Sequence, residues 1–189
     1  MKHTKKLSQS FYAAPALDVA RALIGKHLVH AHAGRRMSGR IVETEAYIGR
    51  EDQACHARFG PTPRAKLLFG PPGFAYVFLV YGMHDCFNVV VEAEGSPAAI
   101  LVRALEPMND TRGATNGPGK LCRALAITRA QNGLDVTDRP LWIEDRDEPP
   151  ATIATTPRIG VDYAGEWANK PWRFVDTQSK WLSRKLPRS

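Results

Sequence analysis

Two glutamates and a tyrosine alternate along one short stretch and could together carry acid–base chemistry. Residues 40–47 read Arg-Ile-Val-Glu-Thr-Glu-Ala-Tyr, an alternating, partly β-branched pattern typical of a strand. Because neighbouring side chains on a strand point to opposite faces, Glu43, Glu45 and Tyr47 share one face. Ile41 falls on the same face. One interpretation is an edge strand whose acidic face lies in water. The other is a working face, since buried carboxylates are costly without partners.

A single arginine interrupts another apolar stretch. Residues 98–105 read Ala-Ala-Ile-Leu-Val-Arg-Ala-Leu, which predicts a strand that contains Arg103. Arginine is seldom buried without an anionic partner. Two interpretations follow: a packed stem whose charged head reaches water, or an ion pair with Glu45 or another acid of the site.

Aromatic residues around a predicted hairpin could form a flat slot. Residues 74–81 and 86–92 are strongly strand-like, and Gly-Met-His-Asp lies between them. This pattern predicts a β-hairpin with Tyr81 at its tip. With Tyr47 and Phe78, such rings could stack on a planar base, above all an electron-poor or cationic one. A carboxylate beside the slot could activate water against a glycosidic carbon. An aromatic at a hairpin tip is, however, more often turn packing than a probe.

Other common chemistries lack their sequence patterns. The histidines and cysteines do not have the paired spacing of a zinc site, so no metal is predicted. No Gly-x-Ser-x-Gly elbow occurs, and Cys55 beside His56 is interpreted as an ordinary thiol. The glycines of residues 117–119 do not match a nucleotide-binding fingerprint, so no cofactor is predicted. The helix start at Lys120 could instead seat a phosphate.

Composition favours a polyanionic partner. The 189 residues carry a net charge of +7, which in a small domain favours nucleic acid, although the basic residues are spread along the chain. The length suits a single domain over residues 1–189. No apolar run could span a membrane, and no signal-peptide core follows the basic start. Three widely spaced cysteines fit a reducing compartment, so a cytoplasmic location without secretion or membrane contact is expected.

Other predicted elements must position these groups. Gly and Pro positions and hydrophobic periodicity predict a helix over 15–24, a strand over 26–33, a turn over 34–39, an irregular segment over 50–73, a helix over 120–127, a strand over 141–144, an acidic loop over 145–156, and strands over 157–161 and 172–176. The basic ends, residues 1–10 and 180–189, are expected to be mobile. The irregular segment is long for a compact domain, which favours a functional loop.

Several short motifs occur together within residues 15–176. They are Val-Glu-Thr-Glu-Ala-Tyr47, Asp52-Gln-Ala-Cys-His56, Tyr76-Val-Phe-Leu-Val-Tyr-Gly-Met83 with Asn88, Leu101-Val-Arg-Ala-Leu-Glu-Pro107, Gly117-Pro-Gly-Lys-Leu-Cys122, and Arg158-Ile-Gly-Val161 with Ala164-Gly-Glu-Trp-Ala168. In this order the chain resembles the alkyladenine (3-methyladenine) DNA glycosylase family, of the type without a helix-hairpin-helix. The resemblance implies an α+β single domain with a curved antiparallel β-sheet, surrounding helices and a protruding, DNA-intercalating β-hairpin.

The resemblance also implies roles for individual residues. Glu45 matches the general base that activates the attacking water, and Arg103 matches a residue that helps to hold this water. The pocket around the flipped base is matched by Tyr47, His56 and Phe78. Asn88 matches the residue that crowds the exocyclic amine of normal guanine.

On the DNA side, the resemblance implies an intercalating hairpin tip. Tyr81 matches the residue that fills the gap left by the flipped nucleotide, with Met83 beside it. Lys120 and the turn before it would hold a backbone phosphate. The implied reaction, in base excision repair, is monofunctional hydrolysis of the N-glycosidic bond of 3-methyladenine or 7-methylguanine in double-stranded DNA, which leaves an abasic site. No lysine matches a Schiff-base nucleophile, so no strand-cleaving lyase step is predicted. A monomer is expected, associated with the nucleoid if the source is bacterial.

Phe78 departs from the family pattern, because relatives can carry tyrosine there. Stacking is kept and a phenolic hydrogen bond is lost, which leaves the excision of hypoxanthine and ethenoadenine open. Two other functions fit the residues. A non-catalytic nucleic-acid-binding module of the same fold would not depend on Glu45, so Glu45→Gln would distinguish it from an enzyme. A glycosidase for free nucleosides or sugars would show weak salt dependence, whereas DNA binding weakens steeply as salt rises.

Overall fold

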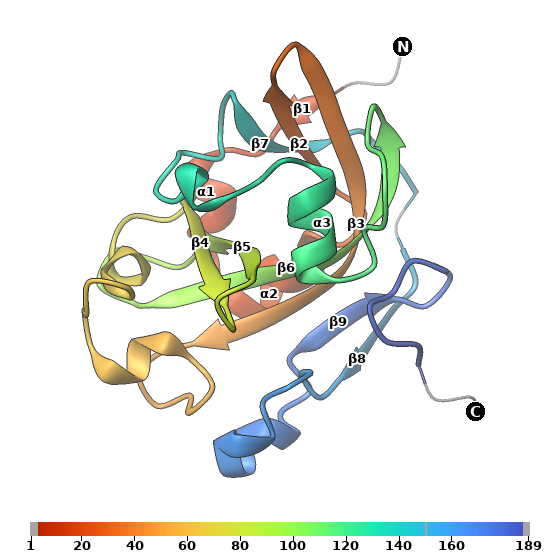
Figure 1. The fold of residues 1–189 in the computed structure, drawn as a ribbon. Coiled ribbons are helices and arrows are strands. Elements are labelled where there is room, and N and C mark those ends of the chain that lie inside the picture. The colour runs from red at the N-terminus through yellow and green to blue at the C-terminus, as the bar shows by residue number, and fades with distance from the viewer. Residues whose placement is uncertain (1–3, 150, 187–189) are drawn as a thin grey trace.

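An antiparallel sheet organises the chain (Figure 1). The computed structural model describes residues 4–149 and 151–186. The strands within these residues are β1 (Lys5–Lys6), β2 (His27–His32), β3 (Arg35–Ile48), β4 (Ala75–Val80), β5 (His84–Val90), β6 (Ala98–Asn109), β7 (Leu141–Asp145), β8 (Ile153–Thr156) and β9 (Arg173–Asp176). The α-helices are α1 (Gln9–Tyr12), α2 (Ala16–Ala22) and α3 (Pro118–Ala124), and the short 3-10 helices are η1 (His56–Phe59), η2 (Lys66–Phe69), η3 (Arg129–Gln131) and η4 (Asp162–Asn169). No helix in this described part is both long and apolar enough to cross a membrane.

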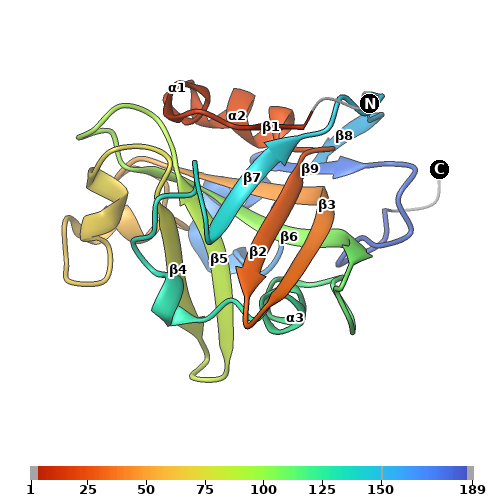
Figure 2. The ribbon, with the colours of Figure 1, turned by 90° about the horizontal axis from the view of Figure 1, so that it is seen from above.

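Strand β3 lies at the centre of the sheet. The strand order is β1-β7-β2-β3-β6-β5-β4, and β9 pairs with both β3 and β8. The pairs between described strands are antiparallel. Helices α1 and α2 lie on one side of the sheet and α3 on the other (Figure 2). The α+β class and the antiparallel sheet predicted from the sequence are confirmed.

A bulge in the middle of β3 re-aims its side chains. The pairing with β6 shifts register between Ile41 and Glu43 and again between Glu43 and Thr44. An unpaired residue in one strand bends it and changes which way the following side chains point. Ile41 therefore packs in the main core together with Ala46, whereas simple alternation placed it on the face of Glu43. Glu43 and Glu45 do share a face, since both contact the same arginine.

The main hydrophobic core ties the helices to the sheet. Buried Val19 and Leu23 of the α2 region and Leu121 and Leu125 of the α3 region belong to one cluster with the inner side chains of the sheet. Full burial of each such side chain contributes about 1.5–3 kcal/mol. This packing fixes β3, β5 and β6, which carry most of the predicted site residues.

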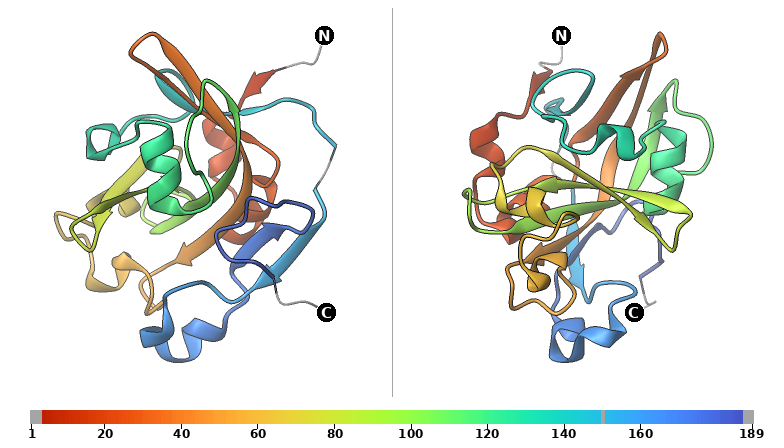
Figure 3. Two further views of the ribbon diagram at one scale, coloured as in Figure 1. Left: turned by 45° about the vertical axis from the view of Figure 1, so that its right-hand side comes forward. Right: turned by 60° about the vertical axis from the view of Figure 1, so that its left-hand side comes forward.

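The predicted hairpin is formed by β4 and β5 and projects from the body of the molecule (Figure 3). Its turn contains Tyr81 and Gly82, with positive φ values of 51° and 69°. Tyr81 is 87% exposed and Met83 71% exposed. The start of α3 packs directly against the hairpin, since a Cβ on Gly119 would lie 2.9 Å from the Cβ of His84. Only glycine allows this close approach.

Three predictions of local structure are wrong. The turn predicted over 34–39 is confined to Ala33 and Gly34, because the residues from Arg35 onward pair with β2 and those from Met37 also pair with β6. Residues 157–161 are irregular, with bends at Ile159 and Gly160, instead of the predicted strand. The strand in this region is β8, which lies inside the predicted acidic loop and pairs with β9. Hydrophobic pattern alone did not show this pairing.

Both ends of the chain make defined contacts where a mobile arm and tail were expected. Lys5–Lys6 form β1 and pair with β7. The backbone N–H of Ser183 donates to Glu43 Oε2 at 2.6 Å. Residues 1–3 and 187–189 of the same prediction lie outside the described residues.

Candidate active site

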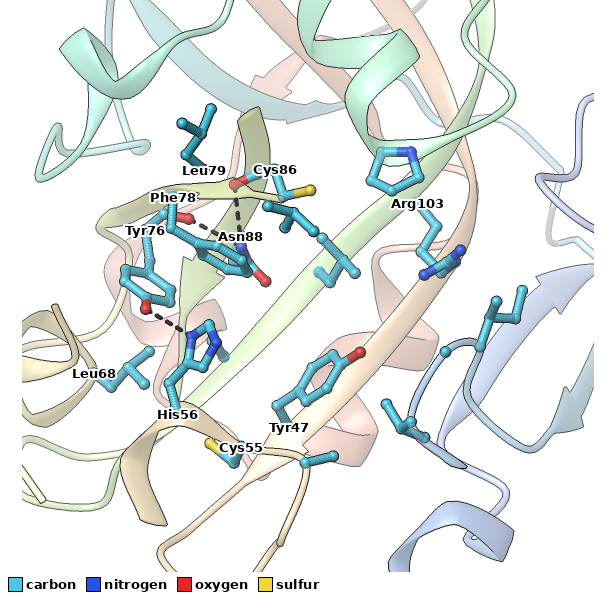
Figure 4. Close-up of a pocket in the computed structure, with 18 of the residues that line it drawn as sticks. Tyr47, Cys55, His56, Leu68, Tyr76, Phe78, Leu79, Cys86, Asn88 and Arg103 are labelled. Carbon is cyan, nitrogen blue, oxygen red and sulfur yellow. Dashed lines mark hydrogen bonds between the residues drawn. The ribbon is translucent and has the colours of Figure 1, made fainter. Parts of the chain in front are cut away.

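A cavity of about 460 Å³ opens beside the C-terminal half of β3. Side chains from β3, η1, β4, β5 and β6 meet in its wall (Figure 4). An apolar wall with a few convergent polar groups is the usual composition of a small-molecule site. Residues of the predicted site that line the cavity are Tyr47, His56, Phe78, Tyr81, Asn88 and Arg103.

Glu45 lies directly behind this wall. Its side chain is fully buried and is not itself part of the lining. Oε1 accepts a hydrogen bond from the Ile159 backbone N–H at 2.7 Å, while Oε2 accepts from the Tyr47 hydroxyl at 2.8 Å and from Arg103 Nη1 at 3.2 Å. All three donor residues line the cavity. Burial raises the pKa of Glu45 above its ordinary value, and the three donors lower it by less. The interpretation of an edge strand with a solvated acidic face is wrong.

Arg103 bridges two carboxylates. Its Nε donates to Glu43 Oε1 and its Nη1 to Glu45 Oε2, both at 3.2 Å, and the residue is only 9% exposed. The predicted ion pair with Glu45 or another acid is confirmed. The alternative, a packed stem with its head in water, is wrong.

Tyr47 is fixed from two directions. Its hydroxyl donates to Glu45, and the guanidinium carbon of Arg158 lies 4.8 Å from its ring centroid. Arg158 in turn makes a bidentate pair with Asp52, with distances of 2.6 and 2.9 Å, and donates to the Ala46 carbonyl at 2.9 Å. A planar guanidinium held by this many acceptors has little freedom. The ring of Tyr47 is therefore immobilised at the edge of the cavity.

His56, Tyr76 and Phe78 form an aromatic wall of the cavity (Figure 4). The rings of His56 and Phe78 are 4.6 Å apart and inclined at 75°. His56 Nδ1 lies 2.9 Å from the Tyr76 hydroxyl. Burial, together with Arg64 and Arg58, lowers the pKa of His56 to about 4, so its ring is neutral at neutral pH. Burial raises the pKa of Tyr76 to about 12. A Tyr76 hydroxyl that donates to Nδ1 leaves the Nε2–H of His56 as a donor for a ligand.

Asn88 presents a fixed amide to the cavity. Its Nδ2 donates to the backbone carbonyls of Tyr76 at 3.0 Å and Cys86 at 3.3 Å, and the residue is 3% exposed. These two bonds within the hairpin fix the orientation of the amide. The side chain therefore limits the shape of what can enter.

The residues predicted to contact DNA lie on the outside. Tyr81 lines the cavity and is exposed at the hairpin tip, close in sequence to exposed Met83. Lys120 is exposed on α3, with its Nζ 3.4 Å from Asn116 Oδ1. Pro118, at the start of the same helix, lines the cavity. The start of α3 therefore lies beside the cavity mouth.

Sequence reasoning missed the groups that hold the site together. The donor at Ile159 is a backbone N–H, which every residue except proline carries, so the type of residue does not indicate this bond. Arg158 and Asp52 are 106 residues apart in the sequence, so no local pattern shows their pairing. Both lay in motifs that carried the family resemblance, which was the one signal that pointed to them.

The side chains around the cavity fit carboxylate chemistry better than metal or thiolate chemistry. Among residues 4–149 and 151–186, no three His, Cys, Asp or Glu side chains are grouped as metal ligands. Burial raises the pKa of the Cys55 thiol to about 11, so it is protonated at neutral pH. The buried Glu45 is left as the candidate base.

Comparison with known proteins gives this cavity a context. The family description Methylpurine-DNA glycosylase (MPG) matches residues 10–180. A protein of Anaeromyxobacter dehalogenans (strain 2CP-C), named "Putative 3-methyladenine DNA glycosylase", is 55% identical over 183 residues, which cover 96% of this chain and 88% of that protein. Proteins of the same name from Myxococcus xanthus (strain DK1622) and Methanocella arvoryzae (strain DSM 22066 / NBRC 105507 / MRE50) are 52% and 49% identical; each match covers 96% of this chain, and 95% and 97% of those proteins. The chain belongs to the methylpurine-DNA glycosylase family.

Family membership makes the protein a DNA glycosylase, a hydrolase of N-glycosyl bonds that acts on DNA in repair. The resemblance predicted from the sequence motifs is confirmed. The alternatives of a non-catalytic module and of a glycosidase for free nucleosides are set aside. The net charge of +7 agrees with a DNA substrate.

Proposed function

We propose that the protein flips alkylated purines, namely 3-methyladenine and 7-methylguanine, out of duplex DNA and hydrolyses their N-glycosidic bond with a water activated by Glu45. The product is an abasic site. The observation that carries the proposal is the fully buried Glu45 carboxylate, bonded to Tyr47 and Arg103, which both line an aromatic cavity. Such a cavity suits an everted base.

The everted purine would lie among Tyr47, His56 and Phe78. Aromatic rings bind a planar base by stacking and favour a cationic one, as many alkylated purines are. The Nε2–H of neutral His56 would donate to an acceptor on the base or its sugar. Asn88 would crowd the exocyclic amine of normal guanine. Phe78 supports stacking without a phenolic hydrogen bond, so hypoxanthine and ethenoadenine would be excised more slowly.

Glu45 would take a proton from a water that binds beside the Glu45–Arg103 pair, on the side of the cavity. A carboxylate whose pKa is raised by burial is a stronger base than an ordinary glutamate. The water would attack the sugar C1′ as the base leaves. A cationic base leaves without prior protonation, and a base that is hydrolysed directly forms no Schiff-base intermediate, so no strand-cleaving step follows.

Tyr81 would fill the gap left in the duplex, with Met83 beside it and Lys120 on a backbone phosphate. An exposed aromatic on a projecting hairpin suits insertion between base pairs. All of these groups come from one chain, so the protein would act as a monomer.

The test is incubation of the purified protein with duplexes that each carry one defined lesion. We expect release of the alkylated purine from 3-methyladenine and 7-methylguanine duplexes, and loss of release in Glu45→Ala. Duplex affinity should weaken steeply as salt rises. An undamaged duplex is the substrate control. A protein that releases no base from any alkylated duplex would contradict the proposal.

A further inference from the structure

Glu43, the first glutamate of the β3 motif, has no role in the reaction proposed above. It is fully buried and does not line the cavity. Its Oε1 accepts from Arg173 Nε at 2.7 Å and from Ser183 Oγ at 2.7 Å, in addition to Arg103 Nε at 3.2 Å. Its Oε2 accepts from the Ser183 backbone N–H at 2.6 Å. A carboxylate engaged by so many fixed donors is not available as a base.

These contacts define how the Arg103 guanidinium is turned. Nε of Arg103 faces Glu43 and lies 3.3 Å from Ser183 Oγ, while Nη1 faces Glu45. Because the guanidinium is planar and its donors form a rigid fork, fixing Nε also fixes the direction of both Nη atoms. Arg103 lines the cavity. The contacts that Glu43 and Ser183 make with Nε therefore determine how the outer edge of the guanidinium, the edge that carries the Nη atoms, is oriented toward the cavity.

The segment after β9 is part of the same arrangement. Ser183 contacts Glu43 through both its backbone N–H and its hydroxyl. Arg173 Nη2 donates to the Arg184 carbonyl at 2.8 Å. This segment is thus bonded to two buried charged side chains directly behind Arg103.

We propose that Glu43 and Ser183 are positioning residues for base excision: they hold the Arg103 guanidinium so that Nη1 faces Glu45 and the outer edge faces the attacking water. This inference rests on the function proposed above. Neither residue lines the cavity, so their effect would pass through Arg103. A displacement of about 1 Å in a reacting group can lower a rate by roughly 100-fold, so loose positioning of Arg103 would be measurable.

The charge of Glu43 also bears on Glu45. The charged and titratable groups around Glu45 are Arg103 from β6, Glu43 and Tyr47 from β3, Arg158, which is paired with Asp52, and Arg173 from β9, which lies opposite Glu45 in the sheet and is paired with Glu43. The negative charge of Glu43 raises the pKa of Glu45, and Arg103 lowers it. If Glu43 becomes neutral, Arg103 acts on Glu45 alone, so the pKa of Glu45 falls and it becomes a weaker base.

The experiment measures single-turnover excision from one alkylated duplex as a function of pH, together with duplex affinity. For Glu43→Gln we expect the excision rate at the plateau of the pH–rate profile to be lower by roughly 10- to 100-fold. The acidic limb, the part of this profile where the rate rises as Glu45 loses its proton, should move to lower pH, and duplex affinity should be unchanged. A merely structural role would lower thermal stability without displacing the limb. Glu144→Gln is the matched control, since Glu144 is also buried and paired with arginines, but its partners Arg36 and Arg146 do not line the cavity.

Ser183→Ala is the second variant, because it keeps every charge and avoids a folding defect from an unpaired arginine. We expect its plateau rate to fall by about 2- to 10-fold, the equivalent of one net hydrogen bond, with the acidic limb unmoved. Ser179→Ala is its control in the same segment and should leave the rate unchanged, since the one side-chain bond of Ser179 within the described part of the chain is local, from the Trp181 N–H to Oγ at 3.1 Å.

The outcomes separate this inference from the proposed function. An active wild type, an inactive Glu45→Ala, and wild-type rates and pH profiles in both Glu43→Gln and Ser183→Ala would overturn the positioning roles alone. A wild type that releases no base would overturn both. A slow Ser183→Ala beside a normal Ser179→Ala would support the positioning role even if Glu43→Gln did not fold.

Discussion

Glu45 and Glu144 occupy similar surroundings in different parts of one sheet, yet only Glu45 adjoins the aromatic cavity, which two of its donors, Tyr47 and Arg103, line. Glu144, on β7, is 2% exposed. It accepts from Arg36 Nη2 at 3.0 Å, from Arg146 Nε at 2.8 Å and from Trp142 Nε1 at 2.7 Å. Glu45 likewise has an arginine and an aromatic donor. The environment beyond these donors decides which carboxylate is a candidate base.

The pKa values of the two glutamates move in opposite directions. Burial acts on both to raise the pKa. For Glu144, the bonds from Trp142 and Arg146 and the nearby positive charges outweigh burial, and its pKa is lowered. For Glu45 they do not, and its pKa is raised, since its arginine partner, Arg103, is shared with Glu43, whereas Glu144 pairs with both Arg36 and Arg146. Many hydrogen-bond donors around a carboxylate stabilise its ionised form and lower its pKa, which makes it a weaker base. A buried carboxylate with fewer donors has a higher pKa and is a stronger base.

We call Glu45 with its hydrogen-bond donors the Glu45 cluster, and Glu144 with its donors the Glu144 cluster. The largest expected difference between the two clusters is in the excision rate. Glu45→Gln keeps the shape of the side chain and removes the base, so single-turnover excision should fall by about 10²- to 10⁴-fold, with duplex affinity kept. Glu144→Gln should leave the rate per folded molecule unchanged. Excision assays on one alkylated duplex, with a binding assay in parallel, measure both. Equal losses in the two variants would contradict the division of roles.

The next difference is in stability, and its sign should be opposite in the two variants. Glu144 has a lowered pKa in the folded state, so it contributes stability above its unfolded pKa and loses it as pH falls through the folded value. Glu45 has a raised folded pKa, so its stabilising contribution is present below the unfolded pKa and lost as pH rises through the folded value. At neutral pH we therefore expect Glu144→Gln to destabilise the protein by about 1–3 kcal/mol, and Glu45→Gln to stabilise it.

Urea unfolding without DNA, at neutral pH and in acid, measures these signs. Both differences from wild type should shrink as pH falls, because each wild-type glutamate then becomes neutral like its glutamine replacement. Two variants that shift the free energy of unfolding in the same direction would contradict the opposed pKa shifts.

Sequence predicted the Glu45 cluster much better than the Glu144 cluster, for physical reasons. Strand alternation places Glu43, Glu45 and Tyr47 on one face. A buried arginine needs an anionic partner, so an ion pair between Arg103 and an acid such as Glu45 could be predicted from the sequence. Alternation failed at Ile41, because a bulge is a property of the pairing with β6 and not of β3 alone. Around Glu144, no local pattern indicates a buried carboxylate.

Long-range partners account for most of what was missed. Ser183 contacts Glu43 across 140 residues, and the basic segment that contains it reads as a mobile tail. Strand β8 forms because β9 offers it an edge, in a segment whose composition favours a loop. The hairpin of β4 and β5 was found because both its strands and its turn are local.

The smallest expected difference concerns the single aromatic donor of each cluster. Tyr47→Phe keeps the ring for stacking but removes the hydroxyl that donates to Glu45 Oε2, a bond that lowers the pKa of Glu45. The acidic limb of the excision rate should move to higher pH by about one unit, the equivalent of about 1.4 kcal/mol. His56 does not obscure this limb, because its pKa of about 4 leaves it neutral above that pH. Excision rates across the acidic range measure the displacement.

Trp142→Phe is the matched change in the other cluster, since it removes the Nε1–H that donates to Glu144 Oε2. It should lower the free energy of unfolding by about 1–3 kcal/mol, as expected for a hydrogen bond to a charged group, and leave the acidic limb where it is. The hydrogen-bond partners of Glu144 within the described residues, Arg36, Trp142 and Arg146, do not line the aromatic cavity. A limb that moved in Trp142→Phe, or stayed fixed in Tyr47→Phe, would mean that the titrating base is not the carboxylate behind Tyr47.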